Sequence, residues 1–240
     1  MHLVLSALIR VHLWFTLFAS MIMLAKIRRQ VVRWCSHSLE EMTRRELMQN
    51  AWHCERVLDV GCGRSSVLGS FRDEIPVRVG VDIFAPAIEE TLREKTHTQA
   101  HQLNVLDIAE TFAENSFDAV IANDLLEHLS REDGLRLIAM MQRIARHKVL
   151  IFTPNGFVPQ GEYDDNPHQK HLSGWTSQQL EDLGFDVVGL GGWKVLHGEG
   201  GQIRWKPRRL WSKISMLTRP WCHTHPQAAF HLFASWQKQR

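Results

Sequence analysis

The chain has 240 residues, and its hydrophobic content of 44% and charged content of 22% are ordinary for a globular protein. This composition excludes a disordered or fibrous chain, and the length suits one α/β domain with a short appendage. The net charge of +2 conceals an uneven distribution, because every acidic residue lies between Glu40 and Glu199. The basic ends could meet an anionic membrane surface or a phosphorylated partner, although basic runs are more commonly just solvated.

The first 37 residues are interpreted as a region apart from a domain in 38–240. The stretch from Leu3 to Ala25 is largely apolar, is interrupted by Arg10 and His12, and precedes a basic cluster at 26–33. A membrane-spanning helix needs ~20 mostly apolar residues. This N-terminal apolar helix is therefore a candidate anchor, and the alternatives are an interfacial helix and a helix packed on the domain. The basic cluster predicts that the domain is cytoplasmic, free or attached to the cytoplasmic face of a membrane.

Residues 38–240 alternate between short apolar runs and helical stretches. Capping pairs begin helices at Ser38 with Glu41, at Ser130 and at Thr176. The apolar runs predict strands at Arg56–Val60, Val77–Asp82, His101–Asn104, Phe117–Ala122, Lys148–Phe152 and Phe185–Leu190. Alternation of this kind is typical of an α/β protein with a Rossmann-like, doubly wound, mostly parallel sheet. The last segment, Ala228–Trp236, follows too soon for another parallel crossover, so we expect an antiparallel strand there.

The strongest local signal is the run VLDVGCGRSS at 57–66. A strand of buried type ends in Asp59, and Gly61 and Gly63 then allow a tight turn against a ligand, since glycine has no Cβ to block the approach. About twenty residues later, VGVDIF ends a second strand with Asp82, whose carboxylate can accept hydrogen bonds from both ribose hydroxyls of a nucleoside. The two linked features predict a nucleoside pocket rather than a structural turn beside a surface Asp.

Together with the segments that follow, these residues resemble the class I S-adenosylmethionine-dependent methyltransferases over most of 57–190. The resemblance implies an enzyme whose cofactor is S-adenosyl-L-methionine, with the glycine loop beside the methionine part and Asp82 at the ribose. It also implies that Asp107 accepts the adenine amino group, that Ile108 packs on the ring and that Asn123 lies beside the sulfonium. The cofactor-binding set implied in this way is Asp59, Gly61, Cys62, Gly63, Asp82, Ile83, Asp107, Ile108 and Asn123.

The segment FDAVIANDLLEHL at 117–129 carries candidate catalytic residues. Asp124, Glu127 and His128 are spaced i, i+3 and i+4, so a helix that starts here would place them on one face toward the cleft. Similar segments occur in quinone-biosynthesis O-methyltransferases, where they are associated with metal or acceptor binding. Here the first member is Asp rather than Glu, and we assign no metal. His128 suits a general base near neutral pH, and the alternative is a structural hydrogen bond.

A long polar loop at 153–175 is expected to form the acceptor side, since loops of that length are usually functional or disordered. It contains Tyr163, His171 and Trp175. The last two resemble a histidine and a tryptophan that precede the next helix in many class I methyltransferases. His171 therefore joins Asp124 and His128 as a candidate catalytic residue, whereas Trp175 is expected to pack on the sheet. We expect methyl transfer to an oxygen, rather than a nitrogen, of a small-molecule, lipid-linked or glycan-type acceptor.

Residues 204–221 interleave basic side chains with Trp205, Trp211 and Trp221. Such a pattern suits nucleic acid or a membrane interface, and the alternative is a solvated amphipathic helix. Nucleic acid ranks below a lipid-linked or phosphorylated acceptor, because the patch is short and the chain is nearly neutral.

Two rival functions use the same features. A nicotinamide-dependent oxidoreductase would use the glycine turn and Asp82, but Ser66 stands where the GxGxxG pattern has its third glycine. A non-catalytic, membrane-associated scaffold could keep the fold, although the intact loop glycines and acidic residues argue against it.

Overall fold

The computed structural model describes residues 38–239 apart from 52, 65, 163–165 and 199–200. Residues Ser38–Arg240 form one compact unit. The apolar helix and basic flank expected at 1–37 lie outside the described residues, as does Tyr163. In the described part of the chain, no helix is both long and apolar enough to cross a membrane.

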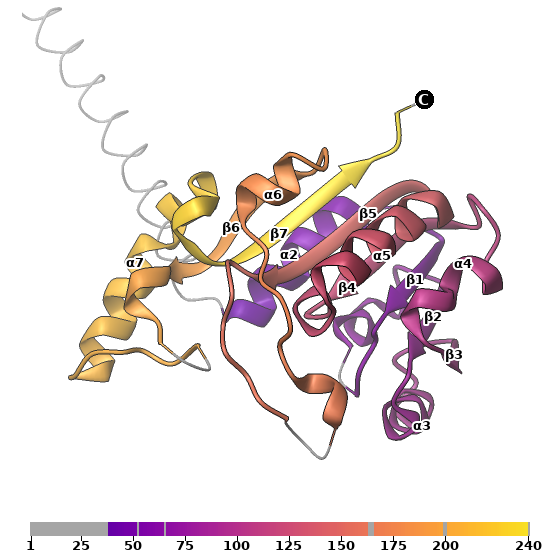
Figure 1. Ribbon diagram of the computed structural model, residues 1–240, viewed down its shortest axis with the longest axis horizontal. Coiled ribbons are helices and arrows are strands. Elements are labelled where there is room, and N and C mark those ends of the chain that lie inside the picture. Colours follow the sequence, from indigo (N-terminus) through magenta and orange to yellow (C-terminus); the bar gives the residue numbers. More distant parts are fainter. Residues whose placement is uncertain (1–37, 52, 65, 163–165, 199–200, 240) are drawn as a thin grey trace, which may run out of the picture. The chain divides into compact units, whose positions relative to one another are not determined.

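The described residues contain a seven-stranded sheet with the order β3-β2-β1-β4-β5-β7-β6 (Figure 1). The strands are β1 Arg56–Val60, β2 Val77–Asp82, β3 Gln99–Gln102, β4 Phe117–Asn123, β5 Ala145–Pro154, β6 Asp186–Trp193 and β7 Ala229–Gln237. Strands β1 to β5 pair parallel. Strand β7 lies between β5 and β6 and is antiparallel to both. The predicted Rossmann-like sheet, mostly parallel with a final antiparallel strand, is confirmed.

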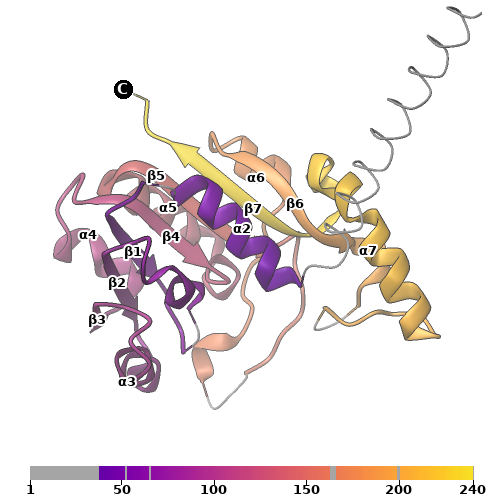
Figure 2. The ribbon, with the colours of Figure 1, turned by 180° about the vertical axis from the view of Figure 1, so that it is seen from behind.

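Helices cover both faces of this sheet. They are α2 Leu39–Ala51, α3 Ala85–Arg93, α4 Ile108–Thr111, α5 Arg131–Ile144, α6 Ser177–Glu181 and α7 Arg208–Thr224. Helix α5 lies in front of the sheet in Figure 1 and α2 lies in front in Figure 2, so the two helices cover opposite faces. The predicted caps form: Ser130 Oγ accepts from Asp133 N at 3.1 Å, and Thr176 makes a capping box with Gln179.

The core follows the central strands, which are buried on both faces as in other parallel sheets. Every residue of β4 except Asn123 is buried. Trp175 is fully buried, as predicted, and its indole N–H donates to Leu126 O at 3.3 Å. Gly134 of α5 makes room for it, because a Cβ there would lie 2.5 Å from the indole. The segment after the long polar loop is thereby fixed to the sheet.

One strand lies two residues earlier in the sequence than predicted. Strand β3 ends at Gln102, two residues before the expected end at Asn104. Leu103 N still donates to Asp82 O at 2.9 Å, but the Asn104 side chain then accepts from Leu106 N at 3.0 Å. This cap begins a 3-10 turn, η2 (Val105–Asp107), and so ends the extended chain.

Candidate active site

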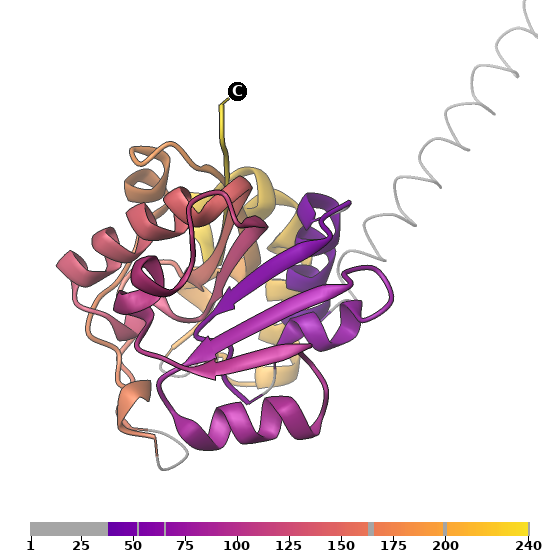
Figure 3. The ribbon, with the colours of Figure 1, turned by 90° about the vertical axis from the view of Figure 1, so that its right-hand side faces the viewer.

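A cavity of about 480 Å³ opens at the carboxyl ends of β1, β2 and β4. Ligands bind at this edge in doubly wound proteins, and the volume falls within the ~300–1,000 Å³ of small-molecule sites. Eight predicted site residues belong to its wall: Gly61, Cys62, Gly63, Asp82, Ile83, Asn123, Asp124 and His128. In Figure 3, β1 to β3 point toward the segment with η4 (Pro167–Gln169), which also belongs to the wall.

The glycine loop is tied to the end of β2. The amides of Gly61 and Cys62 both donate to Val81 O, at 2.8 and 3.0 Å. Gly61 and Gly63 have φ angles of +70° and +57°, a region that side chains disfavour. At Gly61 an added Cβ would lie 2.7 Å from Leu125 Cδ1, whereas at Gly63 it would meet nothing within 4 Å. Gly61 is therefore required for packing, and the open side of Gly63 leaves space for a ligand.

Asp82 organises the same loop from the wall of the cavity. Its Oδ2 accepts from Gly63 N at 2.9 Å, and its Oδ1 accepts from Phe84 N at 2.8 Å. Each carboxylate oxygen retains a second lone pair. Because two backbone amides fix its orientation, the carboxylate is preorganised to accept a pair of hydroxyl groups.

Asp59 does not belong to the cavity wall. It is 2% exposed, and its Oδ2 accepts from Ser66 Oγ and, at 3.1 Å, from His97 Nε2. These contacts join the residue before the glycine loop to the residues that follow it and to the segment before β3. The geometry gives Asp59 a positioning role within the protein rather than contact with a ligand.

Asp107 and Ile108, which were expected at the adenine end of the site, do not belong to the cavity wall. Asp107 is exposed to solvent, and Ile108 is fully buried in the core. The cavity wall is formed instead by Asn104, Val105 and Leu106. The early end of β3 causes this difference, because the residues that follow the strand directly are the ones that reach its carboxyl edge. Asn104 is a polar residue that caps η2 just after β3 ends, and it was the sequence signal that could have identified this part of the cavity wall.

Asn123 and Asp124 follow β4 at the same edge. Asp124 has φ of +49°, a strained conformation for a residue other than glycine. Residues Leu126–His128 then form a single 3-10 turn, η3. The predicted helix beginning at Asp124 is wrong, because this left-handed residue breaks the helical path. Asp124 and His128 still reach the cavity, whereas Glu127 is buried behind them at 3% exposure.

The Asn123 side chain presents an unpaired acceptor. Its Nδ2 donates to Asp124 Oδ2 at 3.3 Å, while its Oδ1 is buried without a hydrogen-bond partner among the described residues. Buried acceptors without a partner are rare in folded proteins. Because Asn123 belongs to the cavity wall, the position fits a ligand that brings an N–H or O–H donor.

Two carboxyl groups beside the cavity are shifted toward their protonated forms. Burial raises the pKa of Asp124 to about 7, against a hydrogen bond with Glu127 that lowers it. Burial and the charge of Asp124 raise the pKa of Glu127 well above its usual range, although Thr153 Oγ1 donates to Glu127 Oε2 at 3.0 Å. The two groups therefore hold one proton near neutral pH, and Glu127 holds it more strongly.

Two histidines lie next to this pair. His128 Nδ1 donates to Lys170 O at 3.3 Å, and His171 Nδ1 donates to Val158 O at 2.6 Å, so each ring keeps an Nε2 lone pair. Burial lowers the pKa of His128 to about 4, helped by His171, whose ring centroid is 4.8 Å away. His171 itself does not belong to the cavity wall. Ligand atoms of Glu127, His128 and His171 lie within 4.8 Å of one another, so this trio could hold a divalent cation.

The polar loop reaches the site through the backbone of η3. Glu127 O accepts from Leu172 N at 2.8 Å and from Ser173 N at 3.1 Å. At Gly174 a Cβ would lie 2.3 Å from Phe157 N, so the two sides of the loop cross only because this residue is glycine. The loop places Lys170 and neighbouring residues on the cavity wall.

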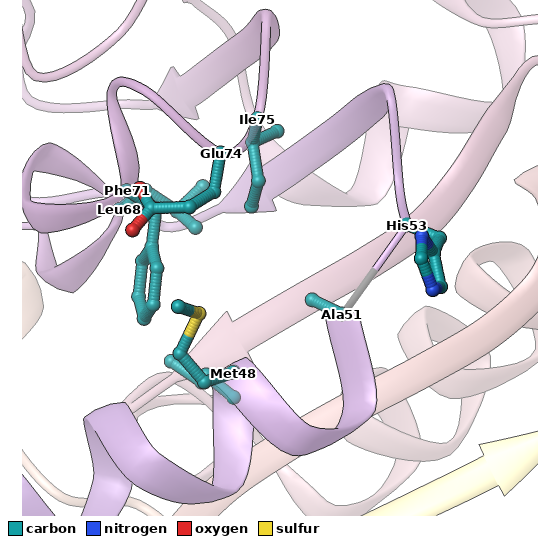
Figure 4. Close-up of a pocket in the computed structure, with 8 residues that line it drawn as sticks. Met48, Ala51, His53, Leu68, Phe71, Glu74 and Ile75 are labelled. Carbon is teal, nitrogen blue, oxygen red and sulfur yellow. The ribbon is translucent and has the colours of Figure 1, made fainter.

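A second cavity of about 180 Å³ lies between α2 and the 3-10 turn η1 (Val67–Phe71) (Figure 4). Its wall is mostly apolar, with His53 and Glu74 as its titratable residues. It shares no residue with the larger cavity. The candidate chemistry is therefore confined to the larger one.

The fold and the site define a class of protein. A sheet of this order, with a glycine loop and an acidic residue at the ends of β1 and β2, is that of a Rossmann-like methyltransferase. Residues 58–153 match the family model of the methyltransferase domain. This match confirms the recognition of the class I S-adenosylmethionine-dependent methyltransferases, and with it the enzyme class and the cofactor. The match does not support the oxidoreductase rival.

Solved structures share this fold. A SAM-dependent methyltransferase from Archaeoglobus fulgidus is 19% identical, with 83% of this chain and 94% of that chain covered and a TM-score of 0.54. The 1,6-didemethyltoxoflavin-N1-methyltransferase of Burkholderia thailandensis is 16% identical, with 95% and 90% covered and a TM-score of 0.53. The magnesium protoporphyrin IX methyltransferase of Synechocystis PCC 6803 is 14% identical, with 84% and 78% covered and a TM-score of 0.50. No curated protein matches the sequence.

Proposed function

We propose that this enzyme transfers the methyl group of S-adenosylmethionine to an oxygen of a small-molecule or lipid-linked acceptor, in the cytoplasm. The observation that carries the proposal is that one cavity joins the glycine loop and Asp82 to the Asp124 and His128 side chains. The cofactor supplies an activated methyl group on its sulfonium. The chain supplies alignment of the acceptor, and a place for the proton that a hydroxyl releases.

The cofactor side is assigned from the polar atoms of the wall. Asp82 accepts the two ribose hydroxyls with its remaining lone pairs. The unpaired Oδ1 of Asn123 accepts from the ammonium group of the methionine part. Val105 and Leu106 offer apolar surface to the adenine ring, with Asn104 beside it. The hydrogen-bond donors of the cofactor are thus matched by hydrogen-bond acceptors of the protein.

The acceptor side is assigned from proton affinities and geometry. Asp124 is the general base, because a pKa of about 7 matches the working pH and its carboxylate belongs to the cavity wall. Glu127 is a positioning residue that keeps its own proton and hydrogen-bonds Asp124. His128 is neutral at pH 7 and offers its Nε2 lone pair to the acceptor hydroxyl. His171 orients His128 through their ring contact.

Two proteins of similar fold support a small acceptor, since one is a 1,6-didemethyltoxoflavin-N1-methyltransferase and the other is a magnesium protoporphyrin IX methyltransferase. Lys170 and His168 on the wall favour an acceptor that carries an anionic group near its hydroxyl. A phosphorylated lipid or a small acid has this chemistry.

The test is a binding and turnover assay on the full-length enzyme. S-adenosylhomocysteine is expected to bind at micromolar concentration, with NAD and NADP as negative controls. With an acceptor in hand, kcat/KM should rise with pH through an apparent pKa near 7, and Asp124→Asn should remove this rise. The matched variant Asp107→Asn, which is exposed away from the cavity, should keep the profile. Tight NAD binding without a response to S-adenosylhomocysteine would overturn the proposal.

A second experiment, with a chelator, distinguishes two possible roles of Glu127, His128 and His171. If these groups act only as proton acceptors and positioning residues, dialysis against EDTA leaves turnover unchanged. Loss of turnover that returns with Mg²⁺, Mn²⁺ or Zn²⁺ would assign the trio to a cation and would overturn the metal-free form of the mechanism.

A further inference from the structure

A surface that methyl transfer does not use lies at the end of the sheet formed by β6 and α7 (Figures 1 and 2). Among the described residues, eleven large hydrophobic side chains are exposed, and six of them fall within 193–221. These six are Trp193, Val195, Trp205, Leu210, Leu217 and Trp221, and we call this surface the α7 face. Exposed hydrophobic residues are ordinary when scattered singly, whereas a concentration of them marks an interaction surface.

The orientation of α7 is fixed by its contact with β6. Ser215 and Cys222 are the buried residues of the helix. At Gly189 of β6 a Cβ would lie 2.1 Å from Cys222 O, and at Gly192 it would lie 2.0 Å from Ser215 Oγ. The helix packs directly on the strand because both positions are glycine. The side of α7 opposite Ser215 and Cys222 therefore faces solvent.

The solvent side of α7 carries an apolar stripe. Leu210, Leu217 and Trp221 stand at i, i+7 and i+11, which places them within about 40° of one another around the helix axis. Their exposed fractions are 52%, 67% and 48%. A solvated surface helix carries polar residues on that side. An ordinary solvated amphipathic helix therefore does not explain why Leu210, Leu217 and Trp221 are exposed.

Positive charge surrounds this apolar stripe. Arg204, Lys206, Arg208, Arg209 and Lys213 are all exposed, and none of them forms an ion pair with another described residue. The sequence from 201 to 240 contains no Asp or Glu. The α7 face thus combines exposed apolar side chains, exposed tryptophans and cations that pair with no acidic side chain among the described residues.

We propose that the α7 face docks on an anionic lipid surface. Leu210, Leu217 and Trp221 enter the boundary between headgroups and acyl chains, while the basic side chains contact lipid phosphates. Tryptophan favours this boundary because its ring is apolar and its N–H is polar. Nucleic acid would use the cations and the tryptophan rings but would leave the two leucines in water. The α7 face shares no residue with the active-site cavity, so docking leaves the cavity open.

Vesicle partitioning of the full-length protein tests this surface. The vesicles contain phosphatidylcholine alone or with phosphatidylglycerol. Leu217→Glu with Trp221→Glu is expected to lower the partition constant on anionic vesicles at least about tenfold, because two apolar contacts become charged. The matched variant Leu92→Glu with Leu135→Glu changes two leucines of similar exposure elsewhere and should have no effect. Replacing Arg208, Arg209 and Lys213 by Gln should abolish the preference for anionic over neutral vesicles.

A second readout keeps the test independent of any other membrane contact of the chain. Brominated lipids should quench tryptophan fluorescence less in Trp221→Phe than in the unchanged protein. Unchanged affinity for S-adenosylhomocysteine in all variants establishes that they are folded. The proposal is overturned if the leucine control loses as much partitioning as the α7 variant, or if Trp221 contributes nothing to the quenching. It is overturned as well if the α7 variants lose binding to single-stranded RNA and keep their binding to vesicles.

Discussion

The two halves of the sheet place their functional residues by different means. In the half formed by β1, β2 and β4, the cavity wall is formed at strand ends, by residues that end their strands or follow them directly. The amides of the glycine loop donate to Val81 O and to the Asp82 carboxylate, and both acceptors belong to the next strand in the chain. In the half formed by β5, β7 and β6, the position of a residue in the sequence does not by itself place it in the structure in this way.

In that second half, contacts between residues far apart in the sequence set the geometry. Strand β7 enters the sheet between β5 and β6, and the loop before α6 is held by the backbone of η3 more than forty positions earlier. Gly174, Gly189 and Gly192 matter because another segment crosses them closely. The comparison teaches that the position of the glycine loop and of Asp82 can be inferred from spacing, whereas the position of the polar loop depends on tertiary contacts.

The most damaging change to the first half should be Gly61→Val. The added side chain collides with Leu125 and occupies a left-handed position, so the loop cannot keep its shape. We expect affinity for S-adenosylhomocysteine to fall by at least about a hundredfold, measured by calorimetry. Gly184→Val is the matched control, since Gly184 has φ of +85° and lies away from the cavity. Equal loss of binding and of thermal stability in both variants would mean that the loop is only a structural turn.

A smaller loss should follow Asp82→Ala. The change removes a charged acceptor from the ribose side and frees the amides of Gly63 and Phe84. We expect a cost of roughly 1.5–3 kcal/mol, which is about ten- to 150-fold in the dissociation constant. Asp107→Ala should stay within twofold, because that side chain does not belong to the cavity wall. A large effect at Asp107 would restore the adenine contact that the family resemblance implied.

The third change separates the two halves. Gly174→Ala places a Cβ against the backbone at Phe157, so the polar loop must move, while the glycine loop is untouched. We expect kcat/KM for the acceptor to fall about tenfold or more, with S-adenosylhomocysteine affinity within twofold of the unchanged enzyme. Gly161→Ala, whose added Cβ meets nothing within 4 Å and whose φ is not positive, controls for a general effect of mutating the loop. Equal losses on both ligands would show that the halves are not separable.

The sequence predicted those features that a local pattern of residues specifies. Apolar runs located all seven strands to within a few residues, and capping pairs located the starts of α2, α5 and α6. The glycine loop and Asp82 could be placed for the same reason, since each stands at the end of a strand. The antiparallel direction of β7 agrees with the prediction, but the reason given for it does not hold, because the connection from β6 contains the helix α7 and is long enough for a parallel crossover.

The failures have individual physical causes. The helical face expected at Asp124 depended on an ordinary backbone, and its φ of +49° comes from the turn that leaves β4. Asp107 was expected at the cavity from the family resemblance, but β3 ends at Gln102, two residues before its expected end, and Asn104, Val105 and Leu106 form that part of the wall. The exposed stripe on α7 could not be derived, because an amphipathic pattern does not say which side packs. Only the glycines of β6 decide that question.

The smallest expected effect concerns the stability of the second half, at His231 in β7. Burial lowers the pKa of this imidazole to about 3, with His197 contributing, and its ring stacks on Phe152 at 5.0 Å. The unfolded chain takes up the proton near pH 6.5 and the folded chain does not, so stability is present above that pH and decreases as the pH falls toward 3.

Because of this linkage, the free energy of unfolding decreases by about 2 kcal/mol as the pH falls from 7 to 5. His231→Phe keeps the stacking and removes the titration, so its urea midpoint should depend less on pH over that interval than the midpoint of the unchanged protein. His147→Phe changes an exposed histidine of β5 and should keep the original dependence. If His231→Phe and His147→Phe gave the same pH dependence, the acid sensitivity would have to come from the other histidines whose pKa burial lowers, which are His128, His171 and His197. His128→Asn would then be the next variant to measure.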